Sequence, residues 1–207
     1  MAYDYYVSAF YDWRHGIRTT DIEPLATLEL THAENLAHAN SYSPSDGATI
    51  HSIFRNLNVD PRDYSFVDFG CGKGRVMAEA IRHPFQSVIG VDFAKELCEV
   101  SKANLERVRS SQRCGSVEIH HMDATEFDLP PTPCVAYIYN SFRDPVLSAV
   151  LANIRASVEA RPRHVRIVAV EPVLYDVFDR VPGIRVFKSE RRYAMYDLCD
   201  PNAGSSR

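Results

Sequence analysis

The sequence predicts an α/β protein built on a mostly parallel sheet, with helices covering both faces. From residue 62 onwards, short and almost wholly apolar runs alternate with segments whose apolar residues recur at helical spacing. Apolar runs of this kind are typical of parallel strands that crossover helices bury on both faces. The last two runs are only a few residues apart, which leaves no room for a crossover helix. We therefore expect one of them to run antiparallel to the rest.

The elements follow in order along the chain. The expected strands are residues 64–69, 87–91, 117–122, 134–139, 165–170, 184–187 and 193–198. Apolar stripes predict helices around residues 76–81, 97–108 and 146–154, and Pro172 opens another in the position that proline tolerates. Ahead of the first strand, residues 43–46 carry helix-start chemistry. The apolar face of that helix is formed by Ile50, Ile53, Phe54 and Leu57.

The chain divides near residue 62. We expect residues 1–61 to form a helical cap that recognises the substrate and has no sizeable core of its own. Residues 62–198 form the sheet domain, and residues 199–207 form a flexible tail. Six aromatic residues crowd the first thirteen positions, and we interpret them as packing within the cap. They are Tyr3, Tyr5, Tyr6, Phe10, Tyr11 and Trp13.

Composition excludes several classes of function. A net charge of −4 over 207 residues argues against a broad nucleic-acid-binding face. No apolar stretch approaches the length of a membrane span, and the first residues lack the pattern of a signal peptide. The five cysteines are scattered and form no C-x-x-C pair, which favours the reducing cytoplasm.

The most informative segment is the glycine-rich turn at residues 68–74, between the first strand and the first helix. Glycines at alternate positions allow a sharp turn and close approach of a ligand, and the helix start offers free N–H groups. Arg75 stands where a dinucleotide fingerprint needs its third glycine, and no Walker A motif is present. We interpret Lys73 and Arg75 as solvated residues at the helix start, and Cys71 as a small filler.

The complete D-x-G-x-G-x-G pattern of residues 68–74 resembles motif I of the class I S-adenosylmethionine-dependent methyltransferases. The likeness extends over residues 62–198. It implies a seven-stranded Rossmann-like sheet with the last strand antiparallel, S-adenosyl-L-methionine as cofactor and S-adenosyl-L-homocysteine as product. The cofactor-binding residues it implies are Asp68, Gly70, Cys71, Gly72, Gly74, Asp92, Phe93, Asp123, Ala124 and Asn140.

Several of these residues have a plainer alternative role. Asp92 ends the second strand and can accept both hydroxyls of a ribose, or it can cap the following helix. In the family, the position of Asp123 commonly receives the adenine amino group and that of Asn140 faces the methyl donor, but both residue types also serve turns. We expect no metal at His120 and His121, because adjacent strand residues point to opposite faces.

The catalytic residues remain open at this level. Methyl transfer is an in-line displacement, and a general base is needed only when the acceptor atom is protonated. The candidates are Tyr42, Asn140 and His38, with Tyr42 preferred because the Tyr-x-Pro step should deliver it to the pocket. The other cap histidines, His15, His32 and His51, are weaker candidates, since a surface position explains each of them.

The leading hypothesis is therefore a cytoplasmic methyltransferase that acts on an O or N atom of a small molecule. Residues 139–142 lack the N-P-P-[YF] motif of nucleic-acid amino methyltransferases, so we expect no nucleic-acid partner and no membrane partner. Residues 11–19 and 40–44 look like the N-terminal arm of a bacterial group of small methyltransferases. The Tyr-x-Pro step is also similar to small lysine methyltransferases. A protein or peptide lysine and a non-catalytic cofactor-binding module are the alternatives.

Overall fold

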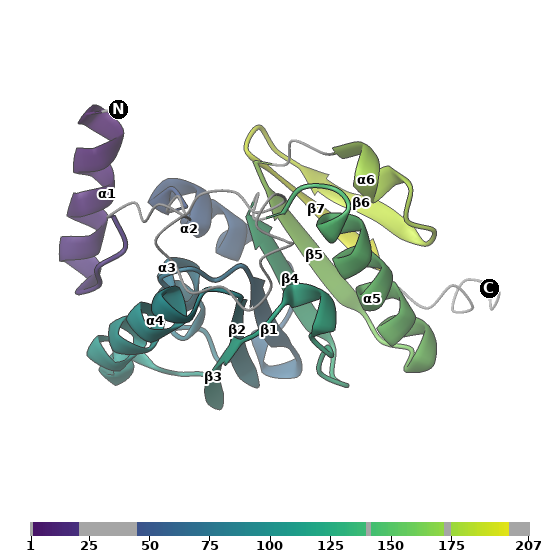
Figure 1. Ribbon diagram of the computed structural model, residues 1–207, viewed down its shortest axis with the longest axis horizontal. Helices are drawn as coiled ribbons and strands as arrows, with labels where there is room; N and C mark the ends of the chain where they lie inside the picture. Colours follow the sequence, from purple (N-terminus) through teal and green to yellow (C-terminus); the bar gives the residue numbers. More distant parts are fainter. Residues whose placement is uncertain (1, 21–44, 140–141, 172–174, 199–207) are drawn as a thin grey trace.

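The computed structural model describes residues 2–20, 45–139, 142–171 and 175–198. These residues form a seven-stranded sheet with the order β3-β2-β1-β4-β5-β7-β6 (Figure 1). The strands are β1 (Ser65–Phe69), β2 (Ser87–Asp92), β3 (Ser116–His121), β4 (Cys134–Tyr139), β5 (Val165–Val170), β6 (Ile184–Ser189) and β7 (Tyr193–Leu198).

Strand direction agrees with the predicted sheet. The pairs β1–β2, β1–β4, β2–β3 and β4–β5 are parallel, whereas β7 is antiparallel to both β5 and β6. The expected antiparallel strand is thus the last one. The strand order reverses between β1 and β4, and ligands of open α/β sheets bind at the carboxyl ends of the strands beside such a reversal.

Helices cover both faces of the sheet (Figure 1). One face packs against α2 (Gly47–Asn56), α3 (Arg75–Ala80) and α4 (Lys95–Arg107), and the other packs against α5 (Val146–Ala160) and α6 (Tyr175–Asp179). The apolar stripes that predict α3, α4 and α5 are buried in these two layers. The start that we expected for the fourth helix, at Pro172, lies outside the described residues.

Burial along the strands explains their composition. Every residue of the central strands β1 and β5 is buried, and so is all of β4 except Tyr139, which is half-buried. The edge strand β3 has no fully buried residue, and its sequence carries a charged side chain and two histidines. Position in the sheet therefore decides how apolar each strand is.

The buried apolar residues among the described part of the cap enter the core of the sheet domain. Ile50, Ile53 and Leu57 of the α2 region pack in one cluster with Phe66 of β1 and Met77 of α3. The helix begins at Asp46, whose carboxylate accepts a hydrogen bond from the backbone N–H of Thr49 at 3.0 Å. The predicted helix start is confirmed.

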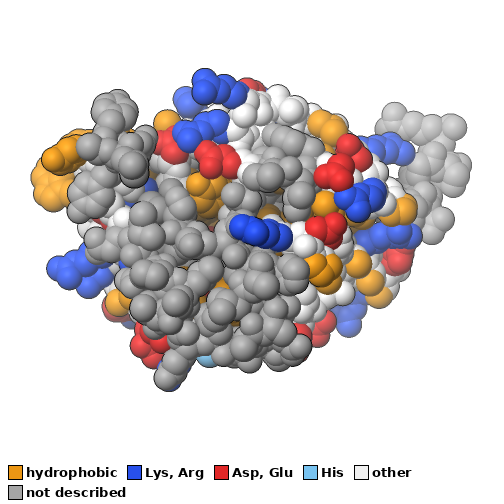
Figure 2. All heavy atoms as spheres, turned by 45° about the horizontal axis from the view of Figure 1, so that its top comes forward, with side chains coloured by type: hydrophobic (Ala, Val, Ile, Leu, Met, Phe, Trp, Pro, Cys, Tyr) orange, Lys and Arg blue, Asp and Glu red, His pale blue; other side chains and the backbone are white. Residues whose placement is uncertain are grey.

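The prediction that the N-terminal aromatics pack within the cap is wrong for three of them. They belong to α1 (Ala2–His15), where Tyr6, Phe10 and Trp13 are 71%, 59% and 77% exposed, while Tyr11 is buried. The helical period explains the split, since positions 6, 10 and 13 share one face and position 11 lies on the opposite one. The apolar face of α1 appears at the left edge of Figure 2.

In the part of the chain that the structure describes, no helix is both long enough and apolar enough to cross a membrane. Those same residues include no cluster of three or more His, Cys, Asp or Glu side chains that could hold a metal ion.

Candidate functional site

The glycine-rich loop leaves the carboxyl end of β1 and enters α3. Gly70, Gly72 and Gly74 have φ angles of 77°, 52° and 78°, a region that side chains with a Cβ rarely adopt. Gly74 also lies against α4, because an added Cβ would come within 2.3 Å of the Ser101 hydroxyl. The three glycines are therefore required by backbone geometry, which is the reason the sequence pattern could identify the turn.

Two predicted carboxylates lie at this edge, Asp68 on β1 and Asp92 at the end of β2. Both are buried, with exposures of 2% and 6%. Burial, and after it the charge of Asp92, raises the pKa of Asp68 to about 8. Burial also raises the pKa of Asp92, although backbone N–H donors act in the opposite direction. The site therefore holds two carboxyl groups whose charged forms are disfavoured by their buried surroundings.

Asp92 connects β2 to the glycine loop. Its carboxylate accepts the N–H of Gly72 at 2.8 Å and the N–H of Ala94 at 3.0 Å. It does not cap α4, whose N-cap residue is Ala94. A carboxylate has about four lone-pair positions, so Asp92 keeps acceptor capacity for further donors such as hydroxyl groups.

Two further predicted cofactor-binding residues, Asp123 and Phe93, follow the carboxyl ends of β3 and β2. Asp123 follows β3, is buried, and accepts the N–H and the hydroxyl of Thr125 at 2.8 and 2.7 Å. It caps the short helix that begins at Ala124, so the turn-forming role that competes with ligand binding is present in this chain. Phe93 is half-buried, and its carbonyl lies 3.2 Å from Nε2 of His121.

Cys71 is buried inside the loop, as predicted for a small filler. A Cβ on Gly90 of β2 would approach its Sγ to 2.8 Å, so the thiol occupies space left by the missing side chain. Burial raises the pKa of this thiol, which keeps it protonated and unreactive. The side chain therefore fills space and offers no nucleophile.

The interpretation of Lys73 and Arg75 as solvated residues is wrong, because both are only 3% exposed. The Arg75 guanidinium forms a buried ion pair with Asp12 of α1, with 2.8 Å between Nη2 and Oδ1. It also lies over the ring of Tyr11, with Cζ 4.8 Å from the ring centroid. Asp12 is 63 positions away in sequence, so no local pattern could have revealed the partner.

The catalytic candidates are placed only in part. Tyr42, His38 and Asn140 lie outside the described residues, and so does His32. His15 stacks on Tyr11 with 4.2 Å between ring centroids, and burial lowers its pKa. His51 lies near Glu79 at the far end of α3, with 3.9 Å between Nε2 and Oε2.

A polar group that sequence reasoning missed lies beyond the ends of β4 and β5. Glu171 has a φ of 46°, and its carboxylate accepts a hydrogen bond from the Tyr139 hydroxyl at 3.1 Å. Arg192 joins Glu171, at 2.8 Å, to Asp46 of the cap, at 3.1 Å. These side chains come from four separate stretches of the chain, and no spacing in the sequence indicates that they meet.

Residues 66–160 match the protein family described as a methyltransferase domain. Among curated proteins, no match to the chain was found. Several solved structures share the fold. An RNA methyltransferase from Salinibacter ruber, in complex with S-adenosyl-L-homocysteine, is 19% identical, with a TM-score of 0.52 over 77% of this chain and 95% of that one.

Two further structures show how widely the fold is used. A SAM-dependent O-methyltransferase from Thermotoga maritima is 16% identical, with a TM-score of 0.57 over 77% of this chain and 68% of that one. A precorrin 8W decarboxylase from Methanobacterium thermoautotrophicum is 17% identical, with a TM-score of 0.55 over 77% of this chain and 93% of that one. At these identities the likeness establishes the fold, and function must be argued from the site.

Proposed function

We propose that this chain, which carries a methyltransferase domain on a class I methyltransferase sheet, transfers the methyl group of S-adenosyl-L-methionine to an O or N atom of a small molecule. The observation that carries the proposal is the glycine loop at the strand reversal. Three left-handed glycines lead into a helix start, and two buried carboxyl groups stand beside them on β1 and β2.

The chemistry of these residues suits the cofactor. Asp92 would accept the ribose hydroxyls, and Asp123 with Ala124 would border the adenine. Burial disfavours the ionisation of both Asp68 and Asp92, and the charge of Asp92 adds to this effect at Asp68. A cation bound beside them would restore their ionisation. The α-ammonium group of the cofactor is such a cation, whereas a dinucleotide brings negative phosphates.

When bound, the cofactor supplies a methyl group that its positive sulfur already activates. The protein's own task is then to hold the cofactor and the acceptor in one orientation and to exclude water. The loop and the two carboxylates orient the cofactor. A base is required only for an acceptor that is protonated at working pH, and Tyr42, Asn140 and His38 remain our candidates for contacts on that side.

Polar pairs between the sheet and residues 1–61 support the choice of a small acceptor. Asp46, Arg192 and Glu171 bridge the cap to the ends of β5 and β7, and the Ser45 hydroxyl lies 3.1 Å from that of Tyr137. A cap held at this edge by these contacts would leave less room for a macromolecule. We therefore propose that the cap recognises the substrate. The buried free thiols of Cys71, Cys98, Cys114 and Cys134 support a reducing compartment such as the cytoplasm.

Transfer of a tritiated methyl group tests the acceptor class. The protein is incubated with labelled S-adenosylmethionine and a cell extract, which is then separated into metabolites, protein and nucleic acid. We expect label in the metabolites, and Asp92→Ala should abolish it. Label in protein would favour the lysine alternative, label in RNA would overturn the expected absence of nucleic acid, and no turnover would favour a binding module.

A further inference from the structure

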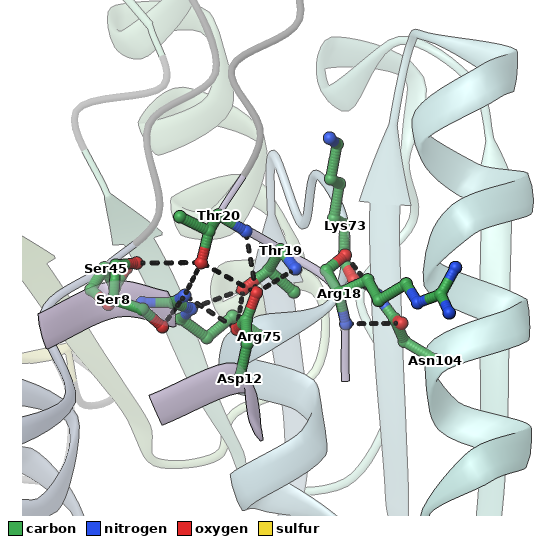
Figure 3. Close-up of polar contacts among 9 residues, drawn as sticks. All are labelled: Ser8, Asp12, Arg18, Thr19, Thr20, Ser45, Lys73, Arg75 and Asn104. Carbon is green, nitrogen blue, oxygen red and sulfur yellow. Dashed lines mark hydrogen bonds and ion pairs between the residues drawn. The ribbon is translucent and has the colours of Figure 1, made fainter. Parts of the chain in front are cut away.

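A buried polar network joins the N-terminal helix to the glycine loop (Figure 3). Its centre is Arg75, the first residue of α3 and the direct neighbour of Gly74. Besides its ion pair with Asp12, its guanidinium donates to the backbone carbonyls of Ser45 at 3.1 Å and Ser8 at 3.3 Å. One side chain at the end of the loop therefore fixes two separate segments of the cap.

Asp12 completes the network on the side of the cap. Its carboxylate accepts the backbone N–H groups of Thr19 and Thr20, and also their hydroxyls at 2.7 and 2.8 Å. The Thr19 hydroxyl in turn accepts a hydrogen bond from Nε of Arg75. Asp12, Thr19 and Arg75 are all buried, so the carboxylate and the guanidinium are satisfied almost entirely by protein groups.

Asn104 of α4 forms a second link between the same segment and the loop. Its side-chain amide donates to the carbonyl of Lys73 at 2.9 Å and to that of Arg18 at 3.0 Å, and it accepts the N–H of Arg18 at 2.9 Å. The segment 18–20 is thus tied to the loop at Lys73 and to the helix start at Arg75. Figure 3 shows these contacts side by side.

Stability alone does not account for a network of this kind. A buried ion pair is weak evidence for stability, because desolvation offsets its attraction, and in some proteins such a pair specifies one arrangement. A glycine-rich loop is entropically costly to order, because glycine loses more conformational freedom on ordering than any other residue. A loop that is ordered in advance binds its ligand at a lower entropic cost.

We propose that Asp12 is a positioning residue for the loop 68–74, acting through Arg75, so that the N-terminal helix sets the affinity of the site for S-adenosylmethionine. The inference rests on the proposed function, because it takes that cofactor as the ligand. Residues 8–20 would then support the cofactor site as well as forming part of the cap.

The test measures the dissociation constant of S-adenosylhomocysteine by calorimetry on the full-length chain. Asp12→Asn keeps the shape of the side chain and removes its charge, and we expect binding to weaken by about tenfold or more. Hydrogen exchange of the free protein should rise within residues 70–75. Asp60→Asn is the matched control, because it breaks an exposed Asp–Arg pair with Arg62 at the amino end of β1 and should leave both readouts unchanged.

A purely structural role gives a different result. It would lower the midpoint of unfolding of Asp12→Asn while the dissociation constant, measured well below that midpoint, stayed within twofold of the wild type; this outcome would overturn the inference. Should Asp12→Asn fail to fold, Thr19→Val removes one hydroxyl of the network, and we expect about threefold weaker binding. Unchanged affinity in that variant would equally count against the inference.

The same titration separates the two claims. If the wild type binds no S-adenosylhomocysteine, the proposed function fails. If the wild type binds and both variants bind equally well, only the positioning role of Asp12 fails.

Discussion

The two halves of the carboxyl edge are built in different ways. On the side of β1, β2 and β3, the candidate site is formed by backbone geometry, with left-handed glycines and with carboxylates that accept hydrogen bonds from nearby N–H groups. Beyond β4 and β5, the polar group consists of side chains from distant stretches of the chain, and Arg192 pairs with Asp46, 146 positions earlier. The first half follows local rules that the sequence reveals, whereas the second depends on tertiary contacts.

Gly74→Ala should have the largest effect, because it disturbs the backbone geometry of the half formed by β1, β2 and β3. The backbone at this position has a left-handed φ of 78°, which is strained for alanine, and the added Cβ would lie 2.3 Å from the Ser101 hydroxyl oxygen. We expect a loss of about 2–4 kcal/mol in the free energy of unfolding and no measurable cofactor binding. Urea unfolding and calorimetry check the two effects. A variant with the stability and affinity of the wild type would show that the loop geometry is not required.

Asp92→Ala tests the contribution of a single carboxylate in the same half of the edge. Losing a charged acceptor should weaken S-adenosylhomocysteine binding by about a hundredfold, the equivalent of about 3 kcal/mol. Asp92→Asn keeps one acceptor oxygen and should fall in between. Equal affinity of all three proteins in a calorimetric titration would remove the ribose assignment and weaken the contrast between the two halves.

Asp68→Asn tests the pH dependence of the half formed by β1, β2 and β3. The pKa of Asp68 is raised to about 8 in the folded protein and is about 4 when unfolded, so the folded state holds more protons between these values. Stability from this group is therefore present at low pH and is lost as pH rises from about 4 to 8. We expect Asp68→Asn to be stabilised relative to the wild type at pH 9 more than at pH 5, as measured by urea unfolding. A difference independent of pH would contradict the raised pKa.

Glu171→Gln should have the smallest effect on cofactor binding, because Glu171 belongs to the other half. The change weakens the link to Arg192, so we expect an altered KM for the acceptor in the labelled transfer assay. The dissociation constant of S-adenosylhomocysteine should stay within about twofold, less than 0.5 kcal/mol. A large loss of cofactor affinity would mean that the two halves are not separate.

These differences explain what could be predicted. The strands, the antiparallel direction of one strand in the final pair and the loop at residues 68–74 follow from local pattern, and the structure confirms them. Arg75 could not be interpreted correctly, because its burial depends on Asp12, far away in sequence. The exposure of three aromatic side chains on α1 was also not predicted, because aromatic composition alone does not indicate which side of a helix packs against the core.

Binding of the cofactor by the glycine loop is tested by the thermal unfolding of the wild type with S-adenosylhomocysteine, with NAD as the control. At a hundredfold excess over its dissociation constant, a ligand adds about 2.7 kcal/mol to the folded state. For a chain of this size we expect Tm to rise by roughly 2–4 °C or more with S-adenosylhomocysteine and to stay unchanged with NAD. No rise with S-adenosylhomocysteine, or a rise with NAD alone, would contradict the assignment of the glycine loop.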